Sequence, residues 1–185
     1  VGDKGINELI SAFKRLHAEH PATRLLLVGP FEDNLDPVSE ETRATIEPFP
    51  AIEAVGWQSD VRPFLAASDV FVFPSYREGF PNTVIEAGAM ELPCIMTDIN
   101  GSREIIGPPH TPLQSDVNMR ICGNGIVIPS KNADALYDAM QWMLEHEEER
   151  LAMGKTARTR VAERYEQGYV REQLYAFYRS VLTIR

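Results

Sequence analysis

The chain has 185 residues, of which 44% are hydrophobic and 24% charged, a composition that excludes a disordered protein and predicts one domain with a sizeable core. A formal net charge of −9, with no long run of Lys or Arg, argues against nucleic acid as a main partner. No stretch of about 18 apolar residues predicts a membrane span, and no charged-then-apolar leader opens the chain. Two cysteines favour a reduced, cytoplasmic setting, and the four histidines lack metal-ligand spacing.

The first predicted element is a helix that begins at residue 4 or 5, with Asp3 available as its cap. Its apolar face has helical spacing and consists of Ile6, Leu9, Ile10, Phe13 and Leu16. Because a helix opens this α/β pattern, we expect a strand before it in a longer protein. The run 24–29 is typical of a parallel strand covered on both faces. The next elements are a largely exposed helix over 37–46, a strand over 51–55 and a short helix over 60–67 introduced by Ser59.

The second half continues the alternation of strands and helices. We expect strands at 70–73, 93–97 and 126–129, a helix at 82–92, and a turn at Asn100-Gly101 followed by a short helix capped by Ser102. Residues 107–124 predict a long polar loop, and the pattern is helical from residue 132 onward. The last helix, at 168–182, has an apolar side that we expect to point inward, made of Val170, Leu174, Phe177 and Val181. This order predicts an α/β fold with a doubly wound parallel sheet.

The candidate site lies in the stretch from Ser75 to Glu86, S-Y-R-E-G-F-P-N-T-V-I-E. A Gly/Pro loop stands here between a predicted buried strand and a predicted helix. In that geometry, unpaired backbone N–H groups and the helix dipole face one point, where an anion can bind. The stretch therefore predicts a phosphate-binding loop.

Two carboxylates, Glu78 and Glu86, flank this loop. A carboxylate beside a diphosphate is repelled by about 1–4 kcal/mol at 4 Å near a protein surface, so neither Glu is expected to hold the phosphates. A carboxylate accepts well from a pair of sugar hydroxyls. The arrangement predicts a nucleoside diphosphate-sugar, with the ribose at one end and the hexose at the other.

The sequence also resembles a known family. The pattern E-G-F-P-N-T-V-I-E, followed by P-C-I-M-T-D-I-N-G-S-R-E-I-I, is similar to the E-x7-E region of retaining glycosyltransferases with the two-domain GT-B fold. The resemblance is closest to the bacterial family 4 (group 1) enzymes that build capsule, O-antigen and other surface glycans. It implies that residues 1–185 form the Rossmann-like, nucleotide-sugar-binding C-terminal half, without its first strand and without the N-terminal acceptor domain. Residues 165–185 would then form a helix that packs back toward that missing domain.

The resemblance implies a role for each matching residue. Glu86 would hold the ribose hydroxyls, and Glu78 would face the hexose near the reacting carbon and stabilise positive character there. Lys4 would neutralise charge on the departing diphosphate, together with an Arg of the strand that is absent here. Lys4 and Glu78 are thus the catalytic candidates. The donor-binding candidates are Lys4, Gly56, Trp57, Glu78, Gly79, Phe80, Pro81, Asn82, Thr83, Glu86, Gly101 and Ser102.

Each of these residues also has an ordinary interpretation. Glu86 could merely complement the helix dipole, Glu78 could be a solvated residue paired with Arg77, and Lys4 could be a plain surface lysine. Trp57 could as readily be a half-buried packing residue as part of a base-binding loop. Turn formation alone would explain Gly79, Phe80, Pro81, Gly101 and Ser102.

The expected function is the transfer of a hexose from a nucleoside diphosphate carrier, with UDP favoured, to an acceptor hydroxyl of a glycan or lipid-linked glycan, with the anomeric configuration kept. No D-x-D triplet occurs, which fits the metal-independent habit of the resembled group, so no metal or cofactor is expected. The fragment alone is expected to be inactive, and the parent could associate peripherally with the inner face of the membrane. The alternatives are a related sugar-nucleotide epimerase and a non-catalytic flavodoxin-like binding module.

Overall fold

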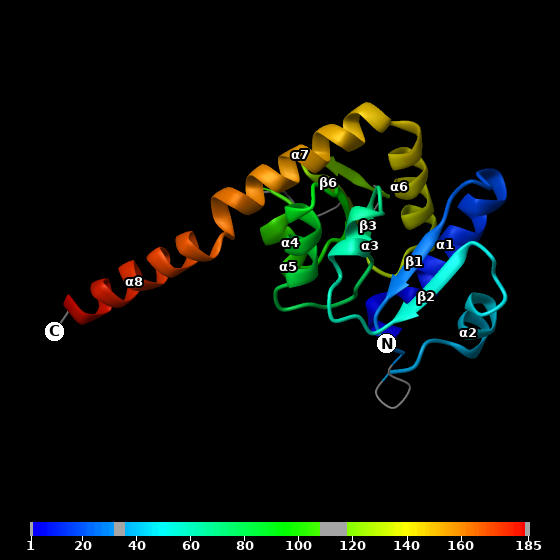
Figure 1. The fold of residues 1–185 in the computed structure, drawn as a ribbon, viewed down its shortest axis with the longest axis horizontal. Helices are drawn as coiled ribbons and strands as arrows, with labels where there is room; N and C mark the ends of the chain where they lie inside the picture. Colours follow the sequence, from blue (N-terminus) through cyan, green and yellow to red (C-terminus); the bar gives the residue numbers. More distant parts are fainter. Residues whose placement is uncertain (1, 32–35, 108–117, 184–185) are drawn as a thin grey trace.

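The computed structural model describes residues 2–31, 36–107 and 118–183 of the chain (Figure 1). Its strands form two sheets. The first is a parallel pair of β1 (Leu25–Val28) and β2 (Ile52–Gly56). The second has the order β3-β4-β6-β5 and is parallel except for β5; its strands are β3 (Phe71–Phe73), β4 (Cys94–Thr97), β6 (Gly125–Ile128) and β5 (Arg120–Cys122).

Helices cover both faces of these strands, as expected for a doubly wound fold. One core lies under α1 (Ile6–Glu19), α2 (Glu40–Ile46) and α6 (Ala133–Glu145). The other lies under α3 (Arg62–Ala66), α4 (Asn82–Ala89) and α5 (Asn100–Ile105), and α7 (Glu147–Arg164) packs on α4. A single 3-10 turn, η1 (Gly2–Lys4), precedes α1, and α8 (Gln167–Thr183) extends away from the body (Figure 1).

The two central strands, β4 and β6, are buried along their whole length. Because strand side chains alternate between faces, Ile95 and Ile126 enter the core beneath α1 and α6. Met96 and Val127 enter the core beneath α4 and α5. The predicted α/β architecture is confirmed.

The start of α1 differs from the prediction in its cap. The predicted apolar face is buried as expected, apart from Ile6, which is partly buried. The N-cap, however, is Gly5 in the left-handed region (φ 70°), with no side-chain cap. Asp3 does not cap the helix, because its carboxylate accepts instead from Arg77 Nε at 3.0 Å. A Cβ at Gly5 would lie 2.2 Å from the carbonyl oxygen of Pro74, so only glycine fits this contact.

The two sheets are separated at the position between β1 and β3. Within the described ranges no strand pairing joins these two strands, and both are only partly buried or exposed, although 24–29 was predicted to be covered on both faces. The first residues of the chain lie at the carboxyl ends of both strands. Gly2 N–H donates to Asp36 O at 2.7 Å, in the loop after β1, and Tyr76 N–H, after β3, donates to Asp3 O at 2.8 Å.

Several predicted boundaries change for local reasons. Helix α2 begins at Glu40 rather than 37 because Ser39 Oγ accepts from Thr42 N–H at 3.1 Å and caps it. Ser59 does not introduce α3; Asp60 Oδ1 accepts from Arg62 N–H at 3.0 Å instead. Helix α4 ends at Ala89, before the predicted 92.

Three further predictions need correction. Asn100-Gly101 is not a turn capped by Ser102, because α5 already begins at Asn100 and Ser102 lies inside the helix. The predicted loop 107–124 contains β5, while its residues 108–117 lie outside the described residues. The apolar side of α8 does not point inward: its side chains are exposed, including Val170, Leu174, Phe177 and Val181.

Candidate functional site

The predicted strand–loop–helix unit is present, at the carboxyl end of β3 and before α4. Open α/β sheets bind their ligands at this edge. No side chain caps α4, whose N-cap is Pro81. Val84 N–H donates to Pro81 O at 3.1 Å, whereas the N–H groups of Asn82 and Thr83 have no protein partner among the residues described. Two donors and the positive end of the helix dipole are therefore available to an anion.

Glu78, in the loop that leads into this helix, forms an ion pair with Lys4 between Oε1 and Nζ. Ser75, fully buried, donates from Oγ to the same Oε1 at 2.8 Å. The Glu78 side chain is only 16% exposed, so it is not the solvated residue of the ordinary interpretation. Nor does Glu78 pair with Arg77, since Arg77 bonds to Asp3.

This pair leaves binding capacity on both partners. An ammonium group has three donors and a carboxylate has about four acceptor positions. Glu78 uses one oxygen for both of its partners, and 43% of the Lys4 side chain is exposed. The site thus presents a cation and a fixed carboxylate at one end of α4.

Helix α5 supports the loop from the side. A Cβ at Gly101 would lie 2.7 Å from Gly79 O and 3.0 Å from Pro81 Cδ, so the two segments are in close contact. Thr97 Oγ1 also donates to Ser75 O at the start of the loop. Ser102 is fully buried and its Oγ has no partner within the described part of the chain. Its side chain is therefore not at the surface where a donor would bind.

The remaining candidates are Glu86, Trp57 and Gly56. Glu86 is exposed and falls in the second turn of α4, not the first. Trp57 is 71% exposed, so the packing interpretation of this residue is wrong. Gly56 ends β2 in the left-handed region (φ 67°), and its carbonyl accepts from Gly29 N–H at 2.8 Å. Within residues 2–31, 36–107 and 118–183, no hydrogen bond, ion pair or ring contact joins Glu86 or Trp57 to the Lys4–Glu78 pair.

Two residues of the site were not singled out from the sequence. Ser75 is the first residue of the motif, and its side chain holds the carboxylate of Glu78, three residues further along the chain. Tyr165 lies far away in the chain, yet its ring stands 5.7 Å from that of Phe80, centroid to centroid. No local pattern could reveal that contact.

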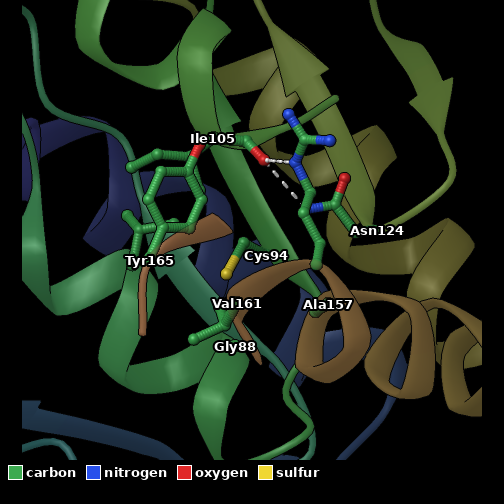
Figure 2. A pocket seen from close by; sticks show the side chains of 9 residues that line it. Gly88, Cys94, Ile105, Asn124, Ala157, Val161 and Tyr165 are labelled. Carbon is green, nitrogen blue, oxygen red and sulfur yellow. Dashed lines mark hydrogen bonds between the residues drawn. The ribbon is translucent and has the colours of Figure 1, made fainter. Parts of the chain in front are cut away.

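The internal cavity shown in Figure 2 lies between α4, α5 and α7, and Tyr165 is one of its lining residues. Its volume of ≈ 10 Å³ is at the lower limit for a single water molecule, so the cavity is a packing void. Cys94 lines it, and burial raises the pKa of this thiol to about 12. A wider surface pocket lies beside Gly123 and Asn124, at the opposite, amino end of β6.

Within the described ranges, no cluster of three or more His, Cys, Asp or Glu side chains could hold a metal ion. None of the described helices is both long and apolar enough to cross a membrane.

The family model described as "Glycosyl transferases group 1" matches residues 1–160. The chain belongs to this glycosyltransferase family. Among curated proteins, it is 28% identical over 182 residues to the capsular polysaccharide biosynthesis glycosyltransferase CapM of Staphylococcus aureus, covering 98% of this chain and 44% of that protein. The glycosyltransferase chain thus spans less than half the length of this relative.

Solved structures match the glycosyltransferase fold over nearly its whole length. Sucrose-phosphate synthase from Thermosynechococcus elongatus is 27% identical with a TM-score of 0.76, covering 100% of this chain and 44% of that one. Anabaena Alr3699/HepE, solved in complex with UDP, has a TM-score of 0.79 at 19% identity, covering 97% and 46%. The predicted Rossmann-like α/β fold is confirmed, and it matches GT-B glycosyltransferase structures.

Proposed function

We propose that this chain is the nucleotide-sugar-binding C-terminal domain of a retaining family 4 glycosyltransferase. The intact enzyme transfers a hexose from UDP to a hydroxyl of a glycan or lipid-linked acceptor. Membership of the glycosyltransferase family supports the reaction class. The capsule-related relative supports the acceptor class, and the UDP complex of a protein with the same fold supports the nucleotide.

The observation that carries the proposal is the ion pair of Lys4 and Glu78 in the loop that leads into the uncapped helix α4. In the proposed complex, the diphosphate lies against the free N–H groups of Asn82 and Thr83, and Lys4 offsets the charge that builds up as the glycosidic bond breaks. Glu78 faces the hexose and stabilises positive character at the reacting carbon. Glu86 accepts from the ribose hydroxyls.

The loops around this centre complete the donor site in the same proposal. Main-chain N–H groups of Gly79 and Phe80 approach the diphosphate or the hexose, and Gly101 and Ser102 contribute main-chain contacts only. Gly56 and the exposed Trp57 contact the base. No metal ion or cofactor takes part, because Lys4 and the helix dipole supply the positive charge.

The acceptor site belongs to a further domain in this proposal. The gap between β1 and β3 supports a strand that precedes Gly2 in the parent chain and pairs with both. The exposed apolar side of α8 supports a helix that packs on the acceptor domain. The chain alone is therefore expected to bind donor without transferring sugar, and the parent acts in the cytoplasm, at the inner face of the membrane.

A related sugar-nucleotide epimerase remains the second candidate, because it would bind the same donor. The full-length protein separates the two when it is incubated with a UDP-sugar and no acceptor. Epimerisation proceeds under these conditions, whereas transfer does not. Formation of an epimeric UDP-sugar would contradict the transferase proposal.

The direct test of the donor site is a thermal-shift titration with UDP, GDP and ADP. At 100 times its dissociation constant, a bound nucleotide adds about 2.7 kcal/mol to the free energy of unfolding. We expect the largest shift with UDP and a much smaller one in Glu86→Ala. Glu163→Ala, at an exposed position in α7, is the matched control and should respond like the wild type. A wild type that responds to no nucleotide would contradict the proposed function.

A further inference from the structure

Tyr165 contacts Phe80, a residue of the loop 79–81 that precedes α4. Its ring centroid lies 5.7 Å from that of Phe80, with the planes tilted by 59°. Its hydroxyl donates to Glu104 O at 2.8 Å, at the end of α5. We propose that Tyr165 is a positioning residue that holds the loop 79–81 for donor binding. This inference rests on the proposed function, because it assigns that loop to the donor.

Tyr165 can position the loop because it is itself held by the body of the protein. It caps the end of α7, with its N–H donating to Val161 O at 2.9 Å. One turn earlier, Arg160 donates from Nε to Ile105 O at 2.6 Å and from Nη2 to Glu104 O at 3.0 Å. Figure 2 shows Tyr165 and Ile105 among the residues that line the same small cavity.

Two described contacts hold the sides of the loop 79–81. On one side, Gly101 of α5 lies against Gly79 and Pro81. Phe80 itself is 42% exposed, and its described ring contact is with Tyr165. Without that contact, the ring of Phe80 and the main chain that carries it would lose a fixed neighbour, and its N–H would be less well oriented toward a phosphate.

The position of Tyr165 sets it apart from the rest of the site. It lies beyond residues 1–160, which match the family model. It also directly precedes α8, which begins at Gln167. The residue thus connects the loop 79–81 to the helix with the exposed apolar side, and in the proposal its effect on the donor is exerted through Phe80.

The test is a double-mutant cycle on the dissociation constant of UDP, measured by calorimetry. An aromatic pair contributes about 0.5–1.5 kcal/mol, so Tyr165→Ala and Phe80→Ala should each weaken UDP binding by about two- to tenfold. The double variant should be no weaker than Phe80→Ala. Tyr165→Phe keeps the ring and should restore binding to within about twofold of the wild type.

Three controls make the outcome decisive. Tyr169→Ala removes an exposed aromatic ring of α8 and should leave UDP binding unchanged. Urea unfolding shows whether the Tyr165→Ala variant is folded. If that variant is unfolded, Phe80→Ala still tests the contact, because Phe80 is exposed. Additive effects in the double variant, or wild-type affinity in Phe80→Ala, would overturn the inference while the donor site stands. Absence of UDP binding by the wild type would contradict the proposed function itself.

Discussion

Lys4 and Glu78, 74 positions apart in the chain, form an ion pair in the loop that leads into α4. Ser75 provides the second partner of the carboxylate. When no nucleotide-sugar is bound, the ammonium of Lys4 and the partly buried carboxylate of Glu78 thereby neutralise each other. In the proposed complex, the diphosphate competes with Glu78 for the ammonium, and the carboxylate becomes available to the sugar.

The ion pair predicts opposite effects for its two members. Lys4→Ala should weaken UDP binding by about tenfold or more, because a hydrogen bond to a charged group contributes about 1.5–3 kcal/mol. Glu78→Gln should tighten UDP binding severalfold, since it removes a like charge and releases Lys4. Titration calorimetry at low and high salt measures both, and salt should reduce both effects. Equal weakening by the two substitutions would mean that the pair has only a structural role.

Two glycines with the same backbone conformation predict different costs on substitution. Gly5 and Gly56 have φ values of 70° and 67°, so alanine brings a similar backbone strain at each. Only Gly5→Ala also forces a Cβ to within 2.2 Å of Pro74 O, whereas the Cβ at Gly56 meets nothing within 4 Å.

Gly5→Ala should therefore lower the free energy of unfolding by about 1–3 kcal/mol more than Gly56→Ala. Urea unfolding of the two variants side by side measures this difference. Similar losses would show that the start of α1 does not lie against Pro74 in solution.

The buried thiol of Cys94 predicts a loss of stability at alkaline pH. Burial raises the pKa of Cys94 from 9.0 to about 12, so the unfolded chain loses this proton at a lower pH than the folded chain does. The contribution is complete below pH 9 and is lost as the pH rises toward 12.

Above pH 9, this thiol should lower the free energy of unfolding by up to about 1.4 kcal/mol per pH unit. Urea unfolding between pH 8 and 10 measures the slope, and Cys94→Ala, less stable throughout because of its cavity, should show a smaller one. If the free energy of unfolding changed with pH equally in the wild type and in Cys94→Ala, the thiol of Cys94 would not be buried away from water.

The exposed apolar side of α8 predicts tolerance to polar substitution. Leu174→Gln with Phe177→Gln should change the free energy of unfolding by less than about 0.5 kcal/mol per site, as at other surface positions. Leu136→Ala, in the core, should cost about 2–5 kcal/mol. A large loss from the α8 substitutions would show that this helix packs against the body in solution.

Much of the fold could be predicted from the sequence because most elements carry their own periodicity. Helix α1 shows its apolar face within its own residues, and β4 is a continuous apolar run between two turns. The loop before α4 was also predictable, since Gly79, Pro81 and the following helix are neighbours in the chain. Lys4 could be included only through resemblance to a family.

The errors come from contacts that the local sequence does not contain. Asn100-Gly101 is a strong turn signal, but here Gly101 is needed for close approach to Gly79 and lies in the helix. Strand β5 is three residues long and has no alternation to detect. The exposure of β1 and α8 depends on which other segments cover them, and the contact between Phe80 and Tyr165 depends on the whole fold.

The hydrogen bonds of Gly2 and Asp3 connect the chain's first turn to the segments that follow β1 and β3, and Lys4 comes next. Lys4 therefore directly follows two residues, Gly2 and Asp3, whose hydrogen bonds connect the segments after β1 and β3. A strand that paired with both β1 and β3 would hold these residues more firmly. If the proposed function holds, a longer form of the protein should therefore bind UDP at least as tightly as this chain. Residues fused before this turn should therefore change the position of Lys4.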